Sequence, residues 1–164
     1  MESWSIEINK EYLKFSAAHF LIFPDGSSER LHGHNYQVSC EIGGALSEFG
    51  LVLDFKRVKP IIREIVDALD EYWLVPGEHP VLTWKDRGDD VIEVQYRELY
   101  YAAPKSDVII LPLSNISAEK LAAFIGSALL ERIGADFPEM PVERLKLGVE
   151  ETSGQRGCWT FTAS

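Results

Sequence analysis

An alternation of residue types that begins at His32 restricts the fold of this chain more than any other feature. In an extended strand, residues i and i+2 point to the same face. After His34, that face carries one aromatic and three buried-type residues: Tyr36, Val38, Cys40 and Ile42. The pattern therefore predicts a strand over residues 32–42 with one buried face. Because His32 and His34 open this face, their imidazoles can reach a single ion.

A third histidine stands in a similar pattern shortly before this strand. His19 continues an alternation of apolar residues that starts at Leu13, and loop-forming residues 24–29 follow it. Two adjacent strands joined by this loop bring His19 close to His32 and His34. Three imidazole nitrogens leave a tetrahedral zinc ion one open position for water or substrate. The alternative is that the pair binds nothing and His19 is a packed core residue.

Length and composition are those of a globular protein with a sizeable core. The chain has 164 residues, of which 46% are hydrophobic and 26% are charged, and both values are ordinary. We expect residues 1–164 to form a single domain with a hairpin-bearing insertion at about residues 75–112. The net charge of −10 argues against a nucleic-acid surface, which needs clustered lysine and arginine. A local basic patch for a small anionic ligand remains open.

Neither a membrane nor an oxidising compartment is expected. The longest apolar runs, such as residues 108–111, are far too short to span a bilayer. Residues 1–4 lack the basic start and apolar core of a signal peptide, so we expect a cytoplasmic location. Cys40 and Cys158 are too few for a disulfide scaffold, and both are expected to be core thiols.

Periodicity places two strands before a first helix. The first strand begins at Trp4, and its buried parity changes between Ile8 and Leu13, so we expect a bulge or turn near Asn9-Lys10. Asp54 is the expected N-cap of the helix. The apolar stripe of this helix comprises Val58, Ile61, Ile62, Ile65, Val66 and Leu69.

The second half of the chain is expected to hold a hairpin, a helix and two strands. Residues 73–112 are expected to be irregular, apart from a hairpin over 91–102, a polar turn at 85–90 and a buried strand at 108–111. A helix follows, with Ser117 as its N-cap, Glu119 in its first turn and a buried face formed by Leu121, Phe124, Ile125, Ala128 and Leu129. Two strands end the chain, the first from residue 145 into Glu151 and Thr152 and the last through Trp159 and Phe161.

Three acidic residues stand where a negative charge is unfavourable. Asp70 and Glu71 come at the end of the first helix, where the helix dipole disfavours carboxylates. Glu151 shares the parity of buried residues in its strand, where an unpaired carboxylate is costly. Each of them is either a solvated surface residue or a functional one.

In this order, the segments resemble the 6-pyruvoyltetrahydropterin synthase family, which includes the queuosine-pathway 6-carboxytetrahydropterin synthases. The resemblance rests on residues 15–19 (FSAAH), 31–36 (LHGHNY), 50–55, 115–122 and 151–152. It implies an α+β T-fold, with an antiparallel sheet, two helices on one face and the order ββ-α-(hairpin insertion)-α-ββ. It also implies a homo-oligomeric barrel, usually a hexamer made of two trimers, with active sites at subunit interfaces.

The resemblance also implies a ligand set and a substrate. Zinc is held by His19, His32 and His34, and the substrate is a pterin, usually 7,8-dihydroneopterin triphosphate. Glu151, beside Thr152, matches the carboxylate that anchors the pterin ring, while Ser117 and Glu119 match a second pterin-contacting segment. Zinc acts as Lewis acid and template for the side chain at C6. Arg30 is a candidate partner for the triphosphate.

Two departures from the family pattern concern the acid–base residues. The family's catalytic cysteine is replaced, since Ser28 and Glu29 stand four and three positions before His32. This resembles a variant branch in which a glutamate takes the place of the cysteine and the side chain is cleaved to 6-hydroxymethyl-7,8-dihydropterin, an entry to folate. The family's Asp-His pair is here Asp70-Glu71, and His79 is the remaining histidine.

Three functions are therefore compatible with the sequence. The first is a zinc-dependent pterin lyase that uses Glu29 as its base. The second is a 6-pyruvoyl- or 6-carboxy-tetrahydropterin synthase in which Ser28, Asp70 and Glu71 do altered acid–base work. The third is a non-catalytic, zinc-containing module that binds pterins or purines.

Overall fold

The structure, a computed structural model, describes residues 2–164 and divides into two compact units. Unit 1 comprises the residues up to Phe15, Asn35–Ala68 and Ala118–Ser164, and unit 2 comprises Ser16–His34 and Leu69–Ser117. Strands β1 (Ser5–His19) and β2 (His32–Gly43) each run from one unit into the other. The single domain expected from the sequence remains a prediction.

The sheet of unit 1 confirms the alternation predicted for residues 32–42. Its strand order is β1-β2-β8-β9, with β8 (Arg144–Thr152) antiparallel to both β2 and β9 (Gln155–Thr162). The buried residues of β2 lie opposite those of β8 in the pairs Val38↔Val149, Cys40↔Leu147 and Ile42↔Leu145. Burial of matched apolar pairs on one face fixes the register, because a shift of one residue would expose them all.

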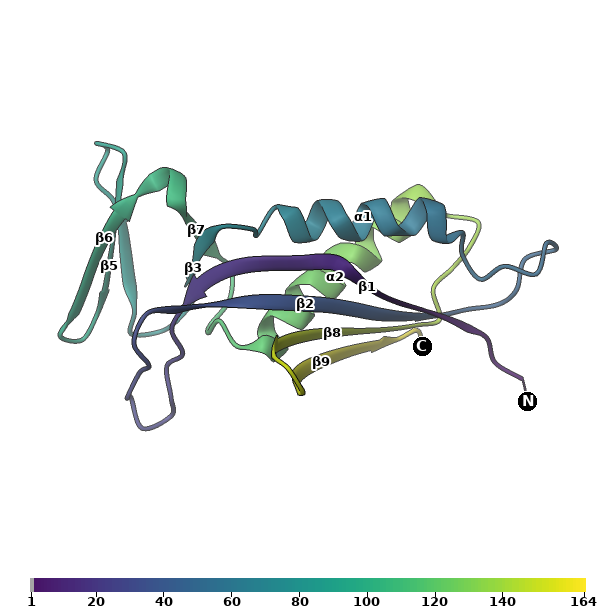
Figure 1. Cartoon of the computed structure of the whole chain (residues 1–164), viewed down its shortest axis with the longest axis horizontal. Helices are drawn as coiled ribbons and strands as arrows, with labels where there is room; N and C mark the ends of the chain where they lie inside the picture. The colour runs from purple at the N-terminus through teal and green to yellow at the C-terminus, as the bar shows by residue number, and fades with distance from the viewer. Residues whose placement is uncertain (1) are drawn as a thin grey trace. The chain divides into compact units, whose positions relative to one another are not determined.

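The expected helices of unit 1 form, but their buried faces differ in part from those predicted. Leu69 lies beyond the end of the first helix. In the second helix, Phe124 and Ala128 are only half-buried, whereas Ala122 and Gly126 are buried. Helix α1 (Phe55–Asp67) begins at Asp54, whose side chain accepts a hydrogen bond from Lys56 N at 2.8 Å. Helix α2 (Ala118–Asp136) lies on β8 and β9, and α1 packs against α2 (Figure 1). A side chain at Gly126 would come within 2.4 Å of the Trp159 ring, so this glycine permits the close approach of α2 to β9.

Strand β1 differs from expectation, because no turn interrupts it. The strand continues through Asn9 and Lys10, and residues 9–12 are all exposed before burial resumes at Leu13. The side-chain amide of Gln37 donates to the carbonyls of both Lys10 and Leu13, at 2.8 and 3.0 Å. This bridge satisfies two backbone acceptors where the buried parity changes. Of the expected bulge or turn, the turn is therefore wrong, because the chain stays extended, and the bulge stays a prediction.

Unit 2 contains a parallel strand that periodicity did not reveal. Strand β3 (Tyr72–Pro76) pairs in parallel with the end of β1 and with β7 (Val108–Leu111). From Trp73 to Pro76 every residue is buried. Central parallel strands are covered on both faces and therefore read as continuous apolar runs, which explains why this segment was expected to be irregular.

A three-stranded antiparallel meander completes the described part of unit 2. It consists of β4 (Thr83–Asp86), β5 (Val91–Tyr96) and β6 (Leu99–Pro104), and a short 3-10 turn, η1 (Lys105–Asp107), leads on to β7. The predicted hairpin is therefore confirmed, whereas β4 occupies part of the expected polar turn. The inner face of the meander joins a buried cluster of Phe20, Ile22, Trp73, Val75, Leu82, Ile92, Val94 and Tyr96.

The two cysteines have different environments. Cys40 is buried, and this burial raises the pKa of its thiol to about 12, so it is a core thiol as expected. Cys158 is exposed, which corrects the expectation. Its neighbours Gly157 and Trp159 both face α2, and alternation along β9 therefore directs Cys158 to the opposite face.

Within residues 2–164, no helix combines the length and apolar character needed to cross a membrane.

Candidate metal and pterin site

The residues predicted for the site are divided between the two units. Unit 1 carries Glu119, Glu151 and Thr152. Unit 2 carries the three histidines and four further candidates: Glu29, Asp70, Glu71 and Ser117. Each group is described within its own unit.

The structure brings His19, His32 and His34 together. One ligand atom from each ring can be chosen so that all three lie within 4.8 Å of one another, and Nε2 of His32 is 2.9 Å from Nε2 of His34. In tetrahedral zinc sites, with Zn–N bonds of about 2.0–2.1 Å, the ligand nitrogens are about 3.3 Å apart. The His32 and His34 nitrogens are somewhat closer than that value and all three lie within 4.8 Å, so the three rings are close enough together to share a zinc ion.

Hydrogen bonds to main-chain carbonyls orient two of these rings. The fully buried His19 donates from Nδ1 to Ile116 O at 2.8 Å, and His32 donates from Nδ1 to Arg30 O at 2.6 Å. A neutral imidazole that donates from one nitrogen presents a lone pair on the other. Nε2 is therefore the available ligand atom in both residues, an arrangement typical of metal-binding histidines.

Asn115 links the orientation of His19 to the chain that follows it. Its side-chain amide accepts from Ile22 N at 3.2 Å and donates to Ile22 O at 2.9 Å. Because Ile116 is the next residue, the carbonyl that accepts from His19 is fixed by the same segment. Asn115 therefore supports the metal site without contributing a ligand.

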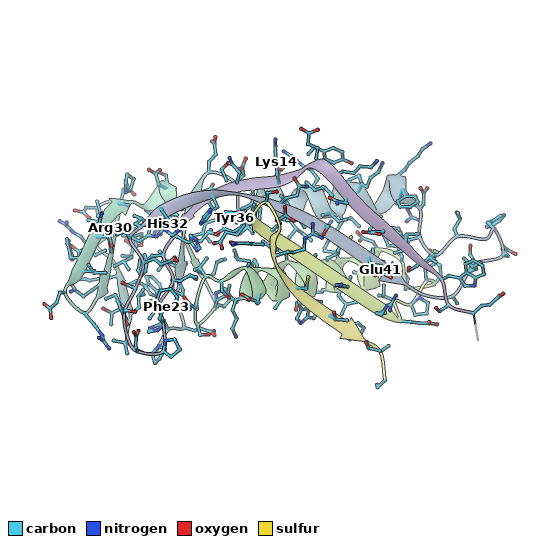
Figure 2. The ribbon with its side chains drawn as sticks, turned by 60° about the horizontal axis from the view of Figure 1, so that its bottom comes forward. Lys14, Phe23, Arg30, His32, Tyr36 and Glu41 are labelled. Atoms are coloured by element: carbon cyan, nitrogen blue, oxygen red, sulfur yellow. The ribbon has the colours of Figure 1, made fainter. Side chains whose placement is uncertain are left out.

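Glu29 lies beside the histidines. Its Oε2 accepts a hydrogen bond from Leu21 N at 3.2 Å and lies 3.8 Å from His32 Nε2. The side chain is one-third exposed, so solvent or a substrate can reach it. Figure 2 shows Arg30 and His32 where the preceding loop returns to β2, with Phe23 farther out on that loop.

The structure gives Asp70 and Glu71 a place at the junction of β1 and β3. Asp70 Oδ1 accepts from Ser16 N, and Glu71 N donates to Ser16 O, both at 2.7 Å. Glu71 has a φ of 64°, a conformation that is uncommon for residues other than glycine. Both residues therefore hold the end of β1, and their acid–base roles remain predictions. Ser117 directly precedes the first residue of α2, the position expected for an N-cap.

His79, the remaining histidine, closes a turn. Its Nδ1 accepts from both Val81 N and Leu82 N at 3.1 Å, and its ring meets the Tyr96 ring edge-on at a centroid distance of 5.6 Å. Partial burial lowers the pKa of His79, which suits a neutral ring that accepts hydrogen bonds. These contacts give the residue a structural role in the turn.

Glu151 occupies an irregular position at the end of β8. The register between β8 and β9 shifts between Glu150 and Thr152, so Glu151 sits at a bulge. It is half-buried, and the hydroxyl of the fully buried Tyr36 lies 3.5 Å from its Oε1. Bulges often re-aim a side chain next to a binding site. Glu151 therefore meets a donor, one of the two outcomes expected from its parity.

The start of α2 lies against the neighbouring strand β9. A side chain at Gly157 would come within 2.4 Å of Glu119 N, so only a glycine allows the backbone of the first helical turn to approach so closely. Gly157 pairs with Val149 of β8, two residues before Glu151. The exposed Glu119 and the half-buried Glu151 thus belong to neighbouring parts of unit 1.

Several supporting groups could not be identified from the sequence. The carbonyls of Arg30 and Ile116 belong to the main chain, and no residue type signals their role. Asn115 stood out only as part of a family motif, because a polar residue before a helix has many ordinary explanations. Tyr36 was correctly expected to be buried, but its hydroxyl contact with Glu151 depends on the pairing of β2 with β8.

Comparison with known proteins identifies the family of this chain. Residues 7–159 match the family described as 6-pyruvoyl tetrahydropterin synthase. A relative from Methanocaldococcus jannaschii, named putative 6-carboxy-5,6,7,8-tetrahydropterin synthase, is 30% identical over 148 residues, covering 90% of this chain and 89% of the relative. A similarly named protein from Pyrococcus horikoshii is 29% identical over 79% of this chain and 77% of its own length.

Solved structures give the same assignment. The 6-pyruvoyl tetrahydropterin synthase from Plasmodium vivax superimposes with a TM-score of 0.92 and 27% identity, covering 99% of this chain and 100% of that one. A second Plasmodium vivax structure, at 26% identity and the same TM-score and coverage, replaces a glutamate described as a catalytic residue of that enzyme by alanine. The expected T-fold is thereby confirmed, and this chain belongs to the 6-pyruvoyl tetrahydropterin synthase family.

Proposed function

We propose that this protein is a zinc-dependent pterin lyase that cleaves the C6 side chain of 7,8-dihydroneopterin triphosphate or a related dihydropterin. The favoured product is of the 6-hydroxymethyl-7,8-dihydropterin type. The observation that carries the proposal is the position of the Glu29 carboxylate, which lies 3.8 Å from Nε2 of His32. His32 is one of the three clustered histidines. The description of a glutamate as catalytic in the Plasmodium vivax relative supports it.

In this proposal, one group of residues holds the metal ion and another binds the pterin ring. His19, His32 and His34 hold zinc, which when bound supplies Lewis acidity toward the side-chain hydroxyls at C6. The Glu151 carboxylate accepts hydrogen bonds from the amino-pyrimidine edge of the pterin, much as a carboxylate does from a guanidinium. Thr152, Ser117 and Glu119 contact the ring.

Glu29 acts as the base in the proposed cleavage. Its carboxylate takes the proton of the hydroxyl on the second side-chain carbon, and the bond between the first and second carbons breaks. The departing fragment becomes an aldehyde, and the electron pair passes to the carbon attached to the pterin. Glu29 then returns the proton to that carbon, so the step is balanced without an oxidant or reductant. Asp70 and Glu71 complete the proposed acid–base set.

The proposed assembly is a homo-oligomer, a hexamer made of two trimers with active sites at subunit interfaces. Its support is membership of the family, for which such barrels are expected. Size-exclusion chromatography with light scattering tests this part separately, and a monomer at assay concentrations would contradict it.

A second candidate is a 6-carboxytetrahydropterin synthase with an altered acid–base set. The relatives from Methanocaldococcus jannaschii and Pyrococcus horikoshii carry that name in putative form. The two candidates differ in the atoms that remain at C6, so mass spectrometry of the product separates them.

The deciding experiment incubates zinc-loaded protein with 7,8-dihydroneopterin triphosphate and identifies the product by mass. The Glu29→Gln variant is expected to lose at least about 100-fold in kcat, because general acid–base catalysis typically contributes 10²–10⁴-fold. Glu48→Gln is the matched control, since Glu48 is exposed in a loop of unit 1. Full turnover in Glu29→Gln would remove Glu29 from the mechanism, and tight pterin binding without any product would favour a non-catalytic module.

A further inference from the structure

The chain between His19 and His32 forms a short hairpin, which we call the arm (residues 21–29). Glu29 N donates to Leu21 O at 2.9 Å, and Phe23 N donates to Ser27 O at 2.8 Å. An isolated bridge between Ile22 and Ser28 lies between these two rungs. Glu29 is thus the last rung of a hydrogen-bonded arm whose tip lies at residues 24–26.

Asn115 holds the arm near its base. Both hydrogen-bonding groups of its amide engage the main chain of Ile22, in the middle of the first strand of the arm. This contact leaves the tip, which is several residues away, to be fixed by another part of unit 2.

Tyr96, the last residue of β5, fixes the tip. Its hydroxyl donates to Gly26 O at 2.9 Å, across 70 positions of sequence, and its side chain is only 3% exposed. The ring belongs to the buried cluster beneath the meander, where His79 packs edge-on against it. Because a packed ring has little freedom, the hydroxyl is a fixed donor.

The side chain of the neighbouring Arg97 also lies against the tip of the arm, at Gly26. Gly26 has a φ of +82°, and a side chain there would lie 1.9 Å from the Arg97 guanidinium. Arg97 itself has a φ of 50° at the turn between β5 and β6, and its guanidinium lies next to Gly26. A residue other than glycine at position 26 would be strained by this φ and would have to displace the end of the Arg97 side chain.

We propose that Tyr96 is a positioning residue: through its hydrogen bond to Gly26, the meander sets the arm and thereby holds the carboxylate of Glu29 beside His32. The rungs of the arm transmit the placement, because a shift at Gly26 moves the Phe23–Ser27 and Leu21–Glu29 pairs together. A displacement of about 1 Å at a catalytic group can cost on the order of 100-fold in rate. This role rests on the proposed function of Glu29 and gives the segment between the two helices a task in the reaction.

Amide hydrogen exchange tests the arm without any assay of activity. In Tyr96→Phe, exchange at Phe23, Gly26 and Glu29 is expected to accelerate about fivefold, the effect of losing one ordinary hydrogen bond. Tyr100→Phe is the matched control, since it removes another tyrosine hydroxyl of the same meander, one that is exposed and donates to Glu93 at 2.7 Å. Unchanged exchange in the arm of Tyr96→Phe, measured on protein with full zinc content, would overturn the proposal.

Kinetics then test whether Tyr96 acts through Glu29. Tyr96→Phe is expected to lower kcat about tenfold with less than about a twofold change in KM. In a Glu29→Gln background, the same change should cost less than about twofold, because the group being positioned is absent. An equal loss in both backgrounds would overturn the positioning role. If the wild type forms no product, the proposed function fails, while the exchange measurement still decides whether Tyr96 holds the arm.

Discussion

The candidate sites of the two units are built in different ways. In unit 2, His19 and His32 are oriented by main-chain carbonyls, and Glu29 accepts from a main-chain amide. In unit 1, Glu151 stands at a bulge with a tyrosine hydroxyl at the long distance of 3.5 Å. We therefore expect the metal site to depend on the main chain that carries these groups, including the segments that Asn115 and Tyr96 hold. For the half-buried Glu151, we expect substitution to alter ring binding without disturbing the fold.

Two histidine substitutions in unit 2 should weaken zinc binding alike but differ in their effect on the stability of the protein. We expect His19→Ala and His32→Ala each to weaken zinc binding by more than about 100-fold, because even the loss of a supporting group beyond the ligands typically costs 10–100-fold. His19→Ala should also destabilise the protein by about 2–4 kcal/mol, since it leaves a cavity and the Ile116 carbonyl without its donor. His32→Ala should destabilise the protein much less, because the His32 side chain is 37% exposed.

Metal analysis and urea unfolding measure these two effects. Full zinc content in either variant would show that the histidine concerned is not a ligand. Equal destabilisation by the two substitutions would contradict the assigned difference in burial.

Substitution of Glu151 in unit 1 should weaken pterin binding and leave the metal site of unit 2 unchanged. We expect Glu151→Gln to weaken pterin binding about 10–100-fold, the range for losing a hydrogen bond to a charged group, while zinc content and melting temperature stay unchanged. Glu150→Gln is the control, because Glu150 pairs with Arg156 at 2.9 Å and is not proposed to touch the ring. Calorimetric titration with a dihydropterin gives the comparison, and equal affinities in both variants would exclude Glu151 from ring recognition.

Removal of the Asn115 amide should destabilise the segment that holds the Ile116 carbonyl against His19, while the metal site still forms. Asn115→Ala loses two hydrogen bonds to Ile22 and is expected to destabilise the protein by about 1–3 kcal/mol. At about 2–4 °C per kcal/mol for a chain of this size, the melting temperature should fall by several degrees. Asn9→Ala, at an exposed position of β1, should leave it unchanged. A melting temperature of Asn115→Ala equal to that of the wild type would contradict the supporting role.

The smallest effect is expected at the His79 turn and depends on pH. Because burial lowers the pKa of His79 in the folded protein, the unfolded chain binds a proton first as the pH falls through the ordinary value of 6.5. The stability of this turn is therefore complete above that value and is lost as the pH falls toward the lowered pKa. Amide exchange at Val81 and Leu82, corrected for its intrinsic pH dependence, should therefore accelerate as the pH falls from about 7.5 to about 5.5. The same pH response in His79→Ala would assign it to another group.

Much of unit 1 could be predicted because its elements bury one face. Alternation gave β2, β8 and β9, and the spacing of Val58, Ile61 and Ile62 gave α1. Unit 2 was harder, since β3 is buried on both faces and carries no periodic signal. The grouping of His19, His32 and His34 followed from parity and one connecting loop. The supports around them could not be predicted, because Arg30 O, Ile116 O and the Tyr96 hydroxyl are brought in by tertiary structure.

Zinc content and X-ray absorption of the purified protein test the central claim most directly. The three histidines predict close to one zinc per chain, with three nitrogen ligands at about 2.0–2.1 Å and one further light-atom ligand. Zinc well below one per chain after loading, or a sulfur ligand from the exposed Cys158, would contradict the proposed site.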